Sequence, residues 1–189
     1  MAVIGFPKQL TLNNFKGLDE APPSANERKG YQLRAETSTT VKYAVDTYSE
    51  IKKDGDTTTT VWKVKRNYSP TLVFNMNETW MLKSVKNDKA EAAETLAHEQ
   101  GHFDISGLCA RIYQRKVLQF EEEKLEDLNK KILALQAEIS EKIDSLNKIY
   151  DEETSIKGTR ENQIIRQQTW LKVIAVCKGN EECEFEAPA

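Results

Sequence analysis

The two histidines of the chain stand four residues apart around a glutamate, in the stretch AHEQGHFDI at residues 97–105. On a helix, residues four apart share a face, so His98 and His102 can place imidazole nitrogens on one metal ion. Glu99 is offset around the helix, where it can take a proton from a zinc-activated water and pass it to a leaving amine. The pattern predicts a Zn²⁺ site with His98 and His102 as metal ligands and Glu99 as catalytic base and acid.

A second interpretation of this stretch is a pair of histidines with ordinary hydrogen bonds. Two histidines placed at random in a chain of this length stand four apart in roughly 1% of arrangements, so chance is a weak explanation. Leu96, Phe103 and Ile105 make the helix largely apolar, and buried imidazoles there would need polar partners. Gly101 costs roughly 1 kcal/mol of helix propensity relative to alanine, which is more easily explained beside a site than in a plain helix.

The first half of the chain, residues 1–86, is expected to be mainly β-structure. The segment TVKYAVDTY alternates, with Val41, Tyr43 and Val45 on one face; KKDGDT supplies a turn; and TTVWKV and TLVFNM follow, the last with Leu72, Phe74 and Met76 on one face. These patterns predict a small antiparallel sheet. A loop rich in proline, serine and asparagine is expected before it, at residues 18–30.

The pattern becomes helical over residues 87–170. Asn87 or Asp88 can cap a first helix that carries the histidines, and no proline or glycine lies between Leu108 and Lys157. Because that stretch is too long for one helix of a globular protein, a turn is expected near residues 120–129, with a second helix over about 128–153. Its apolar stripe comprises Ile132, Leu135, Ile139, Ile143, Leu146 and Ile149 or Tyr150. The expected architecture is one α+β domain over residues 1–189, with a long antiparallel helical hairpin and a C-terminal tail at 171–189.

The hairpin suggests where a third metal ligand comes from. Catalytic zinc usually takes three protein ligands, carboxylates are permitted, and the chain has no third histidine. If the hairpin turn lies near residue 125, the region of residue 150 returns to His102. Asp151, Glu152 and Glu153 are then in range, although each could equally be a solvated charge at a helix end.

Composition limits the classes of partner. The net charge is −3 with 30% charged residues, and acidic and basic residues are mixed along the chain, which argues against a nucleic-acid surface. No stretch approaches 18 consecutive apolar residues, so no membrane span is expected. The opening MAVIGFPKQLTL lacks the basic and apolar regions of a signal peptide.

The three cysteines divide into a pair and a single residue. Cys177 and Cys183 bracket the short polar loop CKGNEEC, which either closes as a disulfide or stays reduced. A disulfide would point to an oxidising compartment. Cys109 lies at helical spacing in LCARIY and is expected in the core.

Beyond these patterns, the chain resembles a known family. HEQGHFDI followed by LCARI resembles the active-site helix of a bacterial group of unknown function, described as zinc-dependent proteases of the zincin class. LTLNNFKG, FNMNETW, YDEET and QQTW are similar to further motifs of that group and occur in the same order, so the resemblance covers nearly the whole chain. It implies a zincin-like fold, peptidase activity on a peptide or protein substrate, and export to the periplasm or the cell surface.

The chain departs from this family after YDEET. The family motif is typically followed by Asn-His, where this chain has Ser155 and Ile156, so the third ligand must differ. Asp151 matches the Asp of the family motif and is the first choice; Glu153, which matches its Glu, and Glu152 are the alternatives. Tyr150 is expected either to donate a hydrogen bond to the oxyanion of the reaction or to be the last core residue of the stripe. By analogy with zincins, TLVFNMNETW is expected to line the substrate cleft.

The resulting hypothesis is a small zincin-like zinc metallopeptidase. Zinc would polarise the scissile carbonyl and its bound water, with Glu99 as general base and acid. Two alternatives remain at this stage: a zinc-binding protein without catalysis, and an interaction module whose charged helical hairpin binds a protein partner. The substrate and the oligomeric state are not readable from the sequence.

Overall fold

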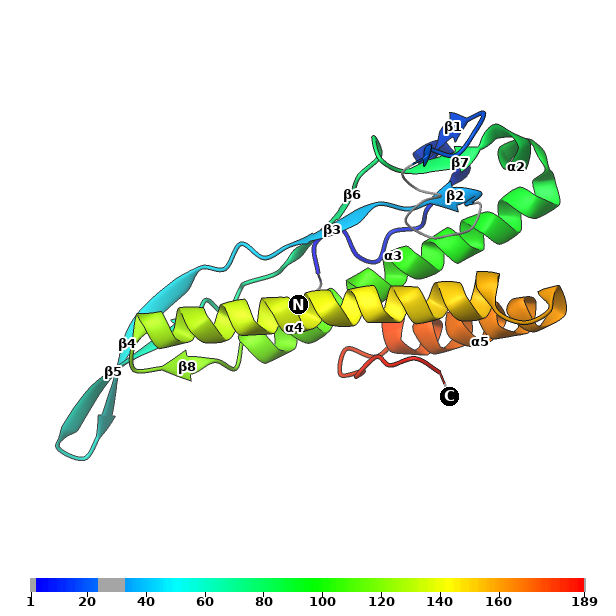
Figure 1. Cartoon of the computed structure of the whole chain (residues 1–189). Helices are drawn as coiled ribbons and strands as arrows, with labels where there is room; N and C mark the ends of the chain where they lie inside the picture. The colour runs from blue at the N-terminus through cyan, green and yellow to red at the C-terminus, as the bar shows by residue number, and fades with distance from the viewer. Residues whose placement is uncertain (1–2, 24–32, 189) are drawn as a thin grey trace.

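The computed structural model describes residues 3–23 and 33–188 of the chain. Three long helices, α3 (Lys89–Val117), α4 (Leu125–Asp151) and α5 (Arg160–Lys178), pack side by side, and short strands run along one side of them (Figure 1). The chain is therefore α+β, as expected. No helix in these described ranges is long and apolar enough to cross a membrane.

Helix α3 begins where the sequence predicts. The carboxylate of Asp88 accepts hydrogen bonds from the backbone N–H groups of Ala90 and Glu91, which satisfies two donors that the first helical turn leaves unpaired. A short helix that was not expected, α2 (Lys83–Asn87), precedes it. The turn after α3 comes slightly earlier than expected, so α4 covers Leu125–Asp151 instead of about 128–153.

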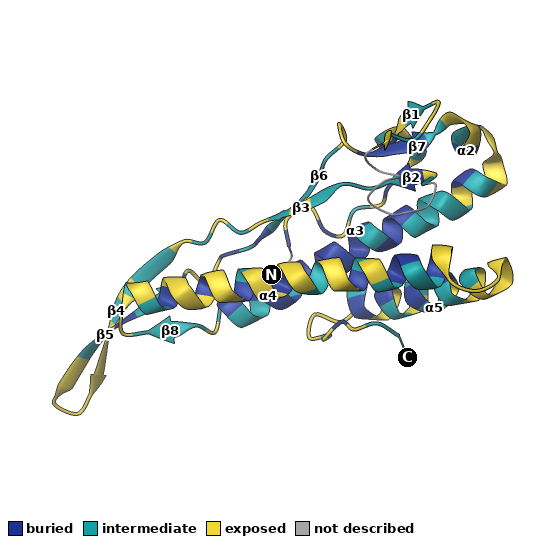
Figure 2. Cartoon of the chain, in the orientation of Figure 1, coloured by how far each residue is buried: buried dark blue, intermediate teal, exposed yellow. Residues whose placement is uncertain are grey.

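Helices α3 and α4 form the expected antiparallel hairpin. Their direction follows from two contacts at opposite ends of the hairpin: His102 of α3 contacts Asn147 of α4, whereas Lys116, further along α3, pairs with Glu138, earlier in α4. The buried stripe of α4 faces α3 (Figure 2). Its buried members are Leu128, Ile132, Leu135, Ile139, Leu146 and Tyr150. The stripe fixes which face of α4 meets α3, and so which residues at its end can reach the histidines.

The strands differ from the expected single antiparallel sheet, because they form three small sheets. In the first, β7 (Trp80–Leu82) lies between β1 (Lys16–Leu18) and β2 (Ala35–Glu36). The second pairs β3 (Thr39–Lys42) with β6 (Thr71–Phe74), and the third has the order β4 (Thr47–Asp54), β5 (Thr57–Val64), β8 (Glu121–Glu122). The β1–β7 pair is parallel, and β8 comes from the turn between α3 and α4.

The strand expected over residues 40–48 is split in two. Between β3 and β4 the chain changes partner from β6 to β5, so residues 43–46 pair with neither strand. The expected turn is confirmed at Gly55, which has a positive φ of 58°. Met76 lies beyond β6 and is exposed, so it does not share the face of Leu72 and Phe74. Most of the loop expected at residues 18–30 lies outside the described residues.

The end of the chain is held by a disulfide and two arginines. Helix α5 ends at Lys178, beyond residue 171 where the tail was expected to begin, because Trp170, Ile174 and Cys177 are buried and extend its packed face. Cys177 and Cys183 form a disulfide with Cα atoms 5.3 Å apart, while Cys109 is a buried free thiol. Arg111 of α3 donates to the Cys177 carbonyl, and Arg115 donates to that of Cys183.

Candidate metal centre

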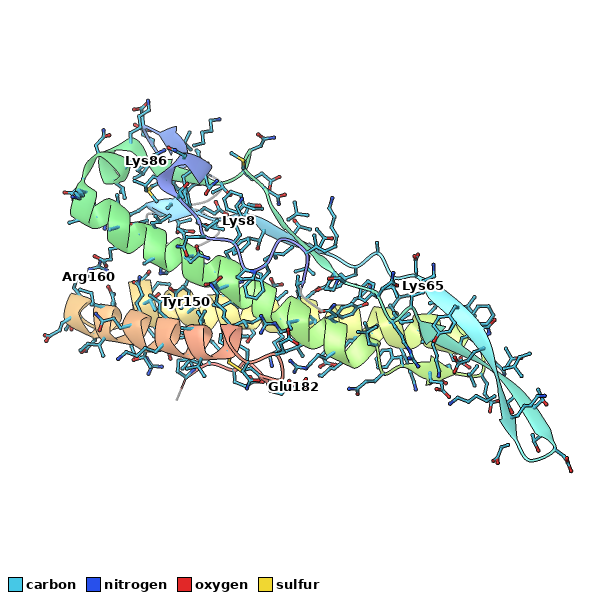
Figure 3. All side chains as sticks on the ribbon, turned by 180° about the vertical axis from the view of Figure 1, so that it is seen from behind. Lys8, Lys65, Lys86, Tyr150, Arg160 and Glu182 are labelled. Atoms are coloured by element: carbon cyan, nitrogen blue, oxygen red, sulfur yellow. A yellow bond between two sulfur atoms is a disulfide. The ribbon has the colours of Figure 1, made fainter. Side chains whose placement is uncertain are left out.

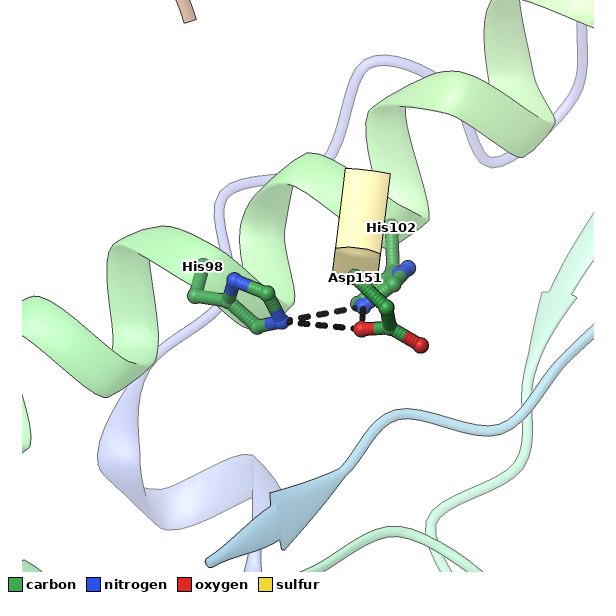
Figure 4. Close-up of side chains that lie close together, drawn as sticks. All are labelled: His98, His102 and Asp151. Carbon is green, nitrogen blue, oxygen red and sulfur yellow. Dashed lines mark hydrogen bonds and ion pairs between the residues drawn. The ribbon is translucent and has the colours of Figure 1, made fainter. Parts of the chain in front are cut away.

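His98 and His102 of α3 meet Asp151, the last residue of α4 (Figure 4). The Nε2 atoms of the two histidines are 3.1 Å apart. The Oδ1 atom of Asp151 lies 3.0 Å from Nε2 of His102 and 3.3 Å from Nε2 of His98. The three sequence-predicted residues are thus brought together, and the antiparallel hairpin returns Asp151 to the histidines as expected.

The spacing of these three atoms suits a metal ion. A tetrahedral ion with bonds of about 2.0–2.1 Å to nitrogen and oxygen separates its ligand atoms by about 3.3–3.4 Å. The observed separations of 3.0–3.3 Å are close to one face of such a tetrahedron. His98, His102 and Asp151 could therefore hold a metal ion, and three protein ligands leave a fourth position for water or substrate.

Each imidazole is oriented by a hydrogen bond on its far nitrogen. Nδ1 of His102 lies 2.8 Å from the side-chain amide oxygen Oδ1 of Asn147, which can only accept. Nδ1 of His98 lies 3.2 Å from the hydroxyl of Thr154, which donates its proton to the Tyr150 carbonyl and so accepts from the histidine. Both Nδ1 atoms are therefore assigned as N–H donors, and both Nε2 lone pairs face the site, as metal binding requires.

A local change in the helix places Thr154. Immediately after Asp151, residues Glu152–Ile156 form one π-helical turn, η2. Such wide turns are frequently found at functional sites. Asp151 immediately precedes the turn and the buried Thr154 lies within it, and both contact the histidine pair.

Glu99 lies in the same cavity as the three candidate ligands. Its side chain is 4% exposed, and its buried Oε2 atom has no hydrogen-bond partner among the described residues. A buried carboxylate oxygen without a partner carries a large desolvation cost. This carboxylate therefore lines the same cavity as a group of residues that could hold a metal ion.

Charged groups around the site raise the pKa of His102. Burial lowers its pKa, but the Asp151 carboxylate, which also accepts a hydrogen bond from the ring, outweighs burial. Glu99 and Asn147 act in the same direction, and the pKa of His102 is raised to about 8. The site therefore attracts positive charge strongly enough to retain a proton when no metal is bound.

Tyr150 lies in the core between the helices (Figure 3). Its side chain is fully buried, and its hydroxyl has no partner among the described residues. Burial, with Glu99 and Asp151 nearby, raises the pKa of the phenol. Tyr150 is absent from the cavity lining, so of its two expected roles the geometry matches the core residue and not the oxyanion donor.

The two alternative ligands, Glu152 and Glu153, turn away from the histidines. Glu152 pairs with Lys157. Glu153 pairs with Arg166 of α5 and accepts a 2.7 Å hydrogen bond from the Trp170 indole. Glu153 therefore joins the η2 turn to α5 and is not in the group that could hold a metal ion.

The candidate metal centre opens into a cavity of about 450 Å³. The residues expected to line it, TLVFNMNETW, do not; the segment at residues 33–39 does, with Asn147, Thr154 and the N-terminal part of α5. Sequence reasoning missed Asn147 and Thr154. Asn147 precedes Asp151 by four residues on α4, so helical spacing could have placed it on the same face. No local signal indicates that residues 33–39 lie beside the cavity.

Comparison with known proteins places the chain in a family. Residues 13–158 match the model of a bacterial protein family of unknown function, DUF922. The matched region contains the two histidines, Glu99, Asp151 and Thr154. No curated protein and no solved structure matches the chain.

Proposed function

We propose that this chain, which belongs to the bacterial family of unknown function DUF922, is a zinc-dependent metallopeptidase with a zincin-like active site. One observation carries the proposal. His98, His102 and Asp151 present three ligand atoms in the spacing of a tetrahedral face, and the partnerless oxygen of Glu99 lies in the same cavity. That combination of three donors, an open fourth position and a buried carboxylate suits hydrolysis better than a purely structural metal site.

The donor atoms favour zinc among the common divalent ions. Two imidazoles and one carboxylate suit zinc, whereas magnesium and calcium prefer sites built from oxygen. Zinc held by these residues would lower the pKa of a bound water and polarise the carbonyl of a peptide bond.

The remaining chemistry belongs to residues of the chain. Glu99 would take the proton of the attacking water and deliver it to the leaving amine, because no described residue donates a hydrogen bond to its buried Oε2 atom. Asn147 and Thr154 would hold the two imidazoles in the tautomer that leaves Nε2 unprotonated. The buried surroundings strengthen each of these interactions, since they exclude water that would screen charge.

The proposal is tested by separating metal binding from proton transfer. The protein and three variants, Glu99→Gln, Asp151→Asn and Glu152→Gln, are purified without a metal-affinity tag, and zinc is measured by elemental analysis. Cleavage is measured on a broad library of peptides. Glu152→Gln is the matched control, since Glu152 pairs with Lys157 outside the site.

We expect one zinc per chain in the parent, in Glu99→Gln and in Glu152→Gln. Cleavage should fall about 100-fold to 10,000-fold in Glu99→Gln, and zinc should be lost from Asp151→Asn. Cleavage that is equal in the parent and in Glu99→Gln would exclude the proposed proton transfer. Zinc without any cleavage that depends on Glu99 would instead favour a metal-binding protein without peptidase activity.

A further inference from the structure

One strand edge beside the cavity has no partner strand within the described part of the chain. β2 is the outer strand of the sheet with the order β1-β7-β2, and β3 pairs only with β6. The two strands follow each other directly, so residues 35–42 form a nearly continuous extended segment with one open side. Edges of this kind present backbone groups that can pair with another chain.

The register shows which groups of Ala35 point outward. The N–H of Leu82 donates to the carbonyl of Arg34, and Ala35 lies opposite Met81. In an antiparallel pair this makes Ala35 a residue whose own N–H and C=O point away from the partner strand. The backbone groups of Ala35 are therefore directed to the open side of β2.

The same argument applies to the start of β3. The N–H of Asn75 donates to the carbonyl of Ser38, and the N–H of Ser38 donates to the hydroxyl of Thr79, so both groups of Ser38 face the sheets. Thr39, opposite Phe74, then directs its own groups outward. Thr37 precedes Ser38 in extended chain, where successive residues alternate in direction. The backbone groups of Ala35, Thr37 and Thr39 have no hydrogen-bond partner among the described residues.

These three residues all line the cavity that contains the candidate metal centre. In Figure 4 the light-blue segment passes beside the three clustered side chains. Gln163 and Gln167 of α5 also line the cavity, so it is bounded by the strand edge and by polar side chains of a helix. From Ala35 to Thr39 the edge extends about 13 Å, the length of about four residues of extended chain.

Two arginines that line the cavity are already paired. Arg34 pairs with Glu91, and Arg160 pairs with Glu94. The Trp80 indole donates a hydrogen bond to Glu36. What the edge offers to a ligand is therefore a row of backbone donors and acceptors at every second residue.

We infer that the cavity binds a polypeptide segment in extended conformation, added as a strand to residues 35–39. An extended chain offers N–H and C=O groups with the same period of two residues, whereas a helix uses these groups internally. Such binding depends on the backbone and tolerates many side-chain sequences. The inference rests on the proposed function in one respect, because it takes the bound segment to be the substrate. That substrate would be an unfolded region of a protein.

The test measures binding separately from cleavage. The Glu99→Gln variant is used so that the probe stays intact, and the probe is reduced, carboxymethylated ribonuclease A, a permanently unfolded protein. Native ribonuclease A is the folded control. Thr37→Pro removes one outward N–H group, at an edge position where proline is compatible with a strand, and Thr37→Val is its matched control, because it removes only the hydroxyl.

We expect the unfolded probe to bind and the native protein not to bind. Affinity should fall at least tenfold in Thr37→Pro and change less than threefold in Thr37→Val, with zinc content equal in both. Equal affinity in the two variants would overturn the inference, as would binding of the native protein with the same affinity. The unfolded probe could bind although the parent protein holds no zinc or shows no cleavage that depends on Glu99. That result would count against the proposed peptidase and not against this inference.

A second measurement covers the case in which Thr37→Pro does not fold. Amide hydrogen exchange of Ala35, Thr37 and Thr39 is followed in the Glu99→Gln protein with and without the unfolded probe. These amides should exchange rapidly in the free protein and become protected when the probe is added. The amide of Ser38, which is already bonded, serves as the internal reference. Unchanged exchange at all three amides with saturating probe would overturn the inference.

Discussion

The phenol ring of Tyr150 stacks on the imidazole of His98, with ring centroids 4.8 Å apart and an interplanar angle of 14°. The hydroxyl end of the same ring lies against Gly101, one turn of α3 further along. Tyr150 therefore contacts both a candidate ligand and a residue without a side chain. A side chain added at Gly101 would push on the ring that packs against His98.

Gly101→Ala tests this packing. A Cβ atom at residue 101 would lie 2.4 Å from the hydroxyl oxygen of Tyr150, and the fully buried ring cannot move away without displacing His98. Overpacking of this kind costs about 1–3 kcal/mol, which exceeds the gain of roughly 1 kcal/mol in helix propensity. We expect a lower free energy of unfolding in urea together with weaker zinc binding.

Gly179→Ala is the matched control for that substitution. Its Cβ atom would meet nothing closer than 3.5 Å, and the residue has a negative φ of −80°. Stability and zinc affinity should therefore stay near those of the parent. If Gly101→Ala is as stable as the parent and binds zinc equally well, the packing argument is wrong.

Thr154→Val tests the hydrogen bond that orients His98. The substitution removes the hydroxyl that accepts from Nδ1 of His98 and donates to the Tyr150 carbonyl. Loss of such an orienting partner weakens metal binding about 10-fold to 100-fold. Competition with a chelator of known affinity measures the effect.

Thr169→Val supplies the comparison, because Thr169 makes the same type of hydroxyl-to-carbonyl bond, to Ile165, on the exposed face of α5. It should leave zinc affinity unchanged. If both valine variants bind zinc as the parent does, Thr154 has no role in orienting the ligand.

The candidate ligands were more predictable than the strands that surround them. The position of Asp151 follows from one long-range assumption, an antiparallel hairpin whose turn lies near residue 125, and the stripe of α4 supports that assumption. The choice of Asp151 over Glu153 depends on α5, because Arg166 and Trp170 hold Glu153. No local pattern in the sequence predicts how α5 packs against the residues that follow α4.

The sheets were predicted poorly for a related reason. Alternation within TVKYAVDTY indicates which residues face the core but not where the chain exchanges one partner strand for another. The β2–β7 and β3–β6 pairs join segments far apart in the sequence, and these pairings define the edge at residues 35–39. The segment that lines the cavity was therefore assigned to TLVFNMNETW by analogy, and this was wrong.

Removal of the Cys177–Cys183 disulfide should destabilise the fold. Closing so short a loop contributes about 2 kcal/mol in the chain-entropy description. The loop also presents carbonyl groups to Arg111 and Arg115, so its loss frees the end of α5. We expect the paired variant Cys177→Ser/Cys183→Ser to unfold at a lower temperature than the parent.

The matching control is treatment with a reductant. It should lower the unfolding temperature of the parent but leave that of the paired variant unchanged, since Cys109 is buried and unpaired. A parent that is insensitive to the reductant would mean that the disulfide adds nothing to stability. A clear effect would agree with a protein that folds in an oxidising compartment.

Two properties should change with pH in opposite directions. The affinity of the site for zinc should rise with pH, and the stability of the metal-free protein should fall. Burial lowers the pKa of His102, but Asp151 outweighs it and raises the pKa from 6.5 to about 8. A proton on His102 competes with zinc, so the association constant should fall roughly tenfold per pH unit below about pH 8 and level off above it. Titration with a competing chelator across this range measures the slope.

The stability of the metal-free protein should change in the other direction. Because the pKa is raised on folding, the stabilisation is complete below pH 6.5 and is lost as the pH rises through 8, to a total of about 2 kcal/mol. Asp151→Asn removes the carboxylate that raises the pKa and should abolish this dependence, while Glu152→Gln should retain it. Metal-free protein that becomes more stable between pH 6.5 and 8 would contradict the assignment of the proton to His102 and Asp151.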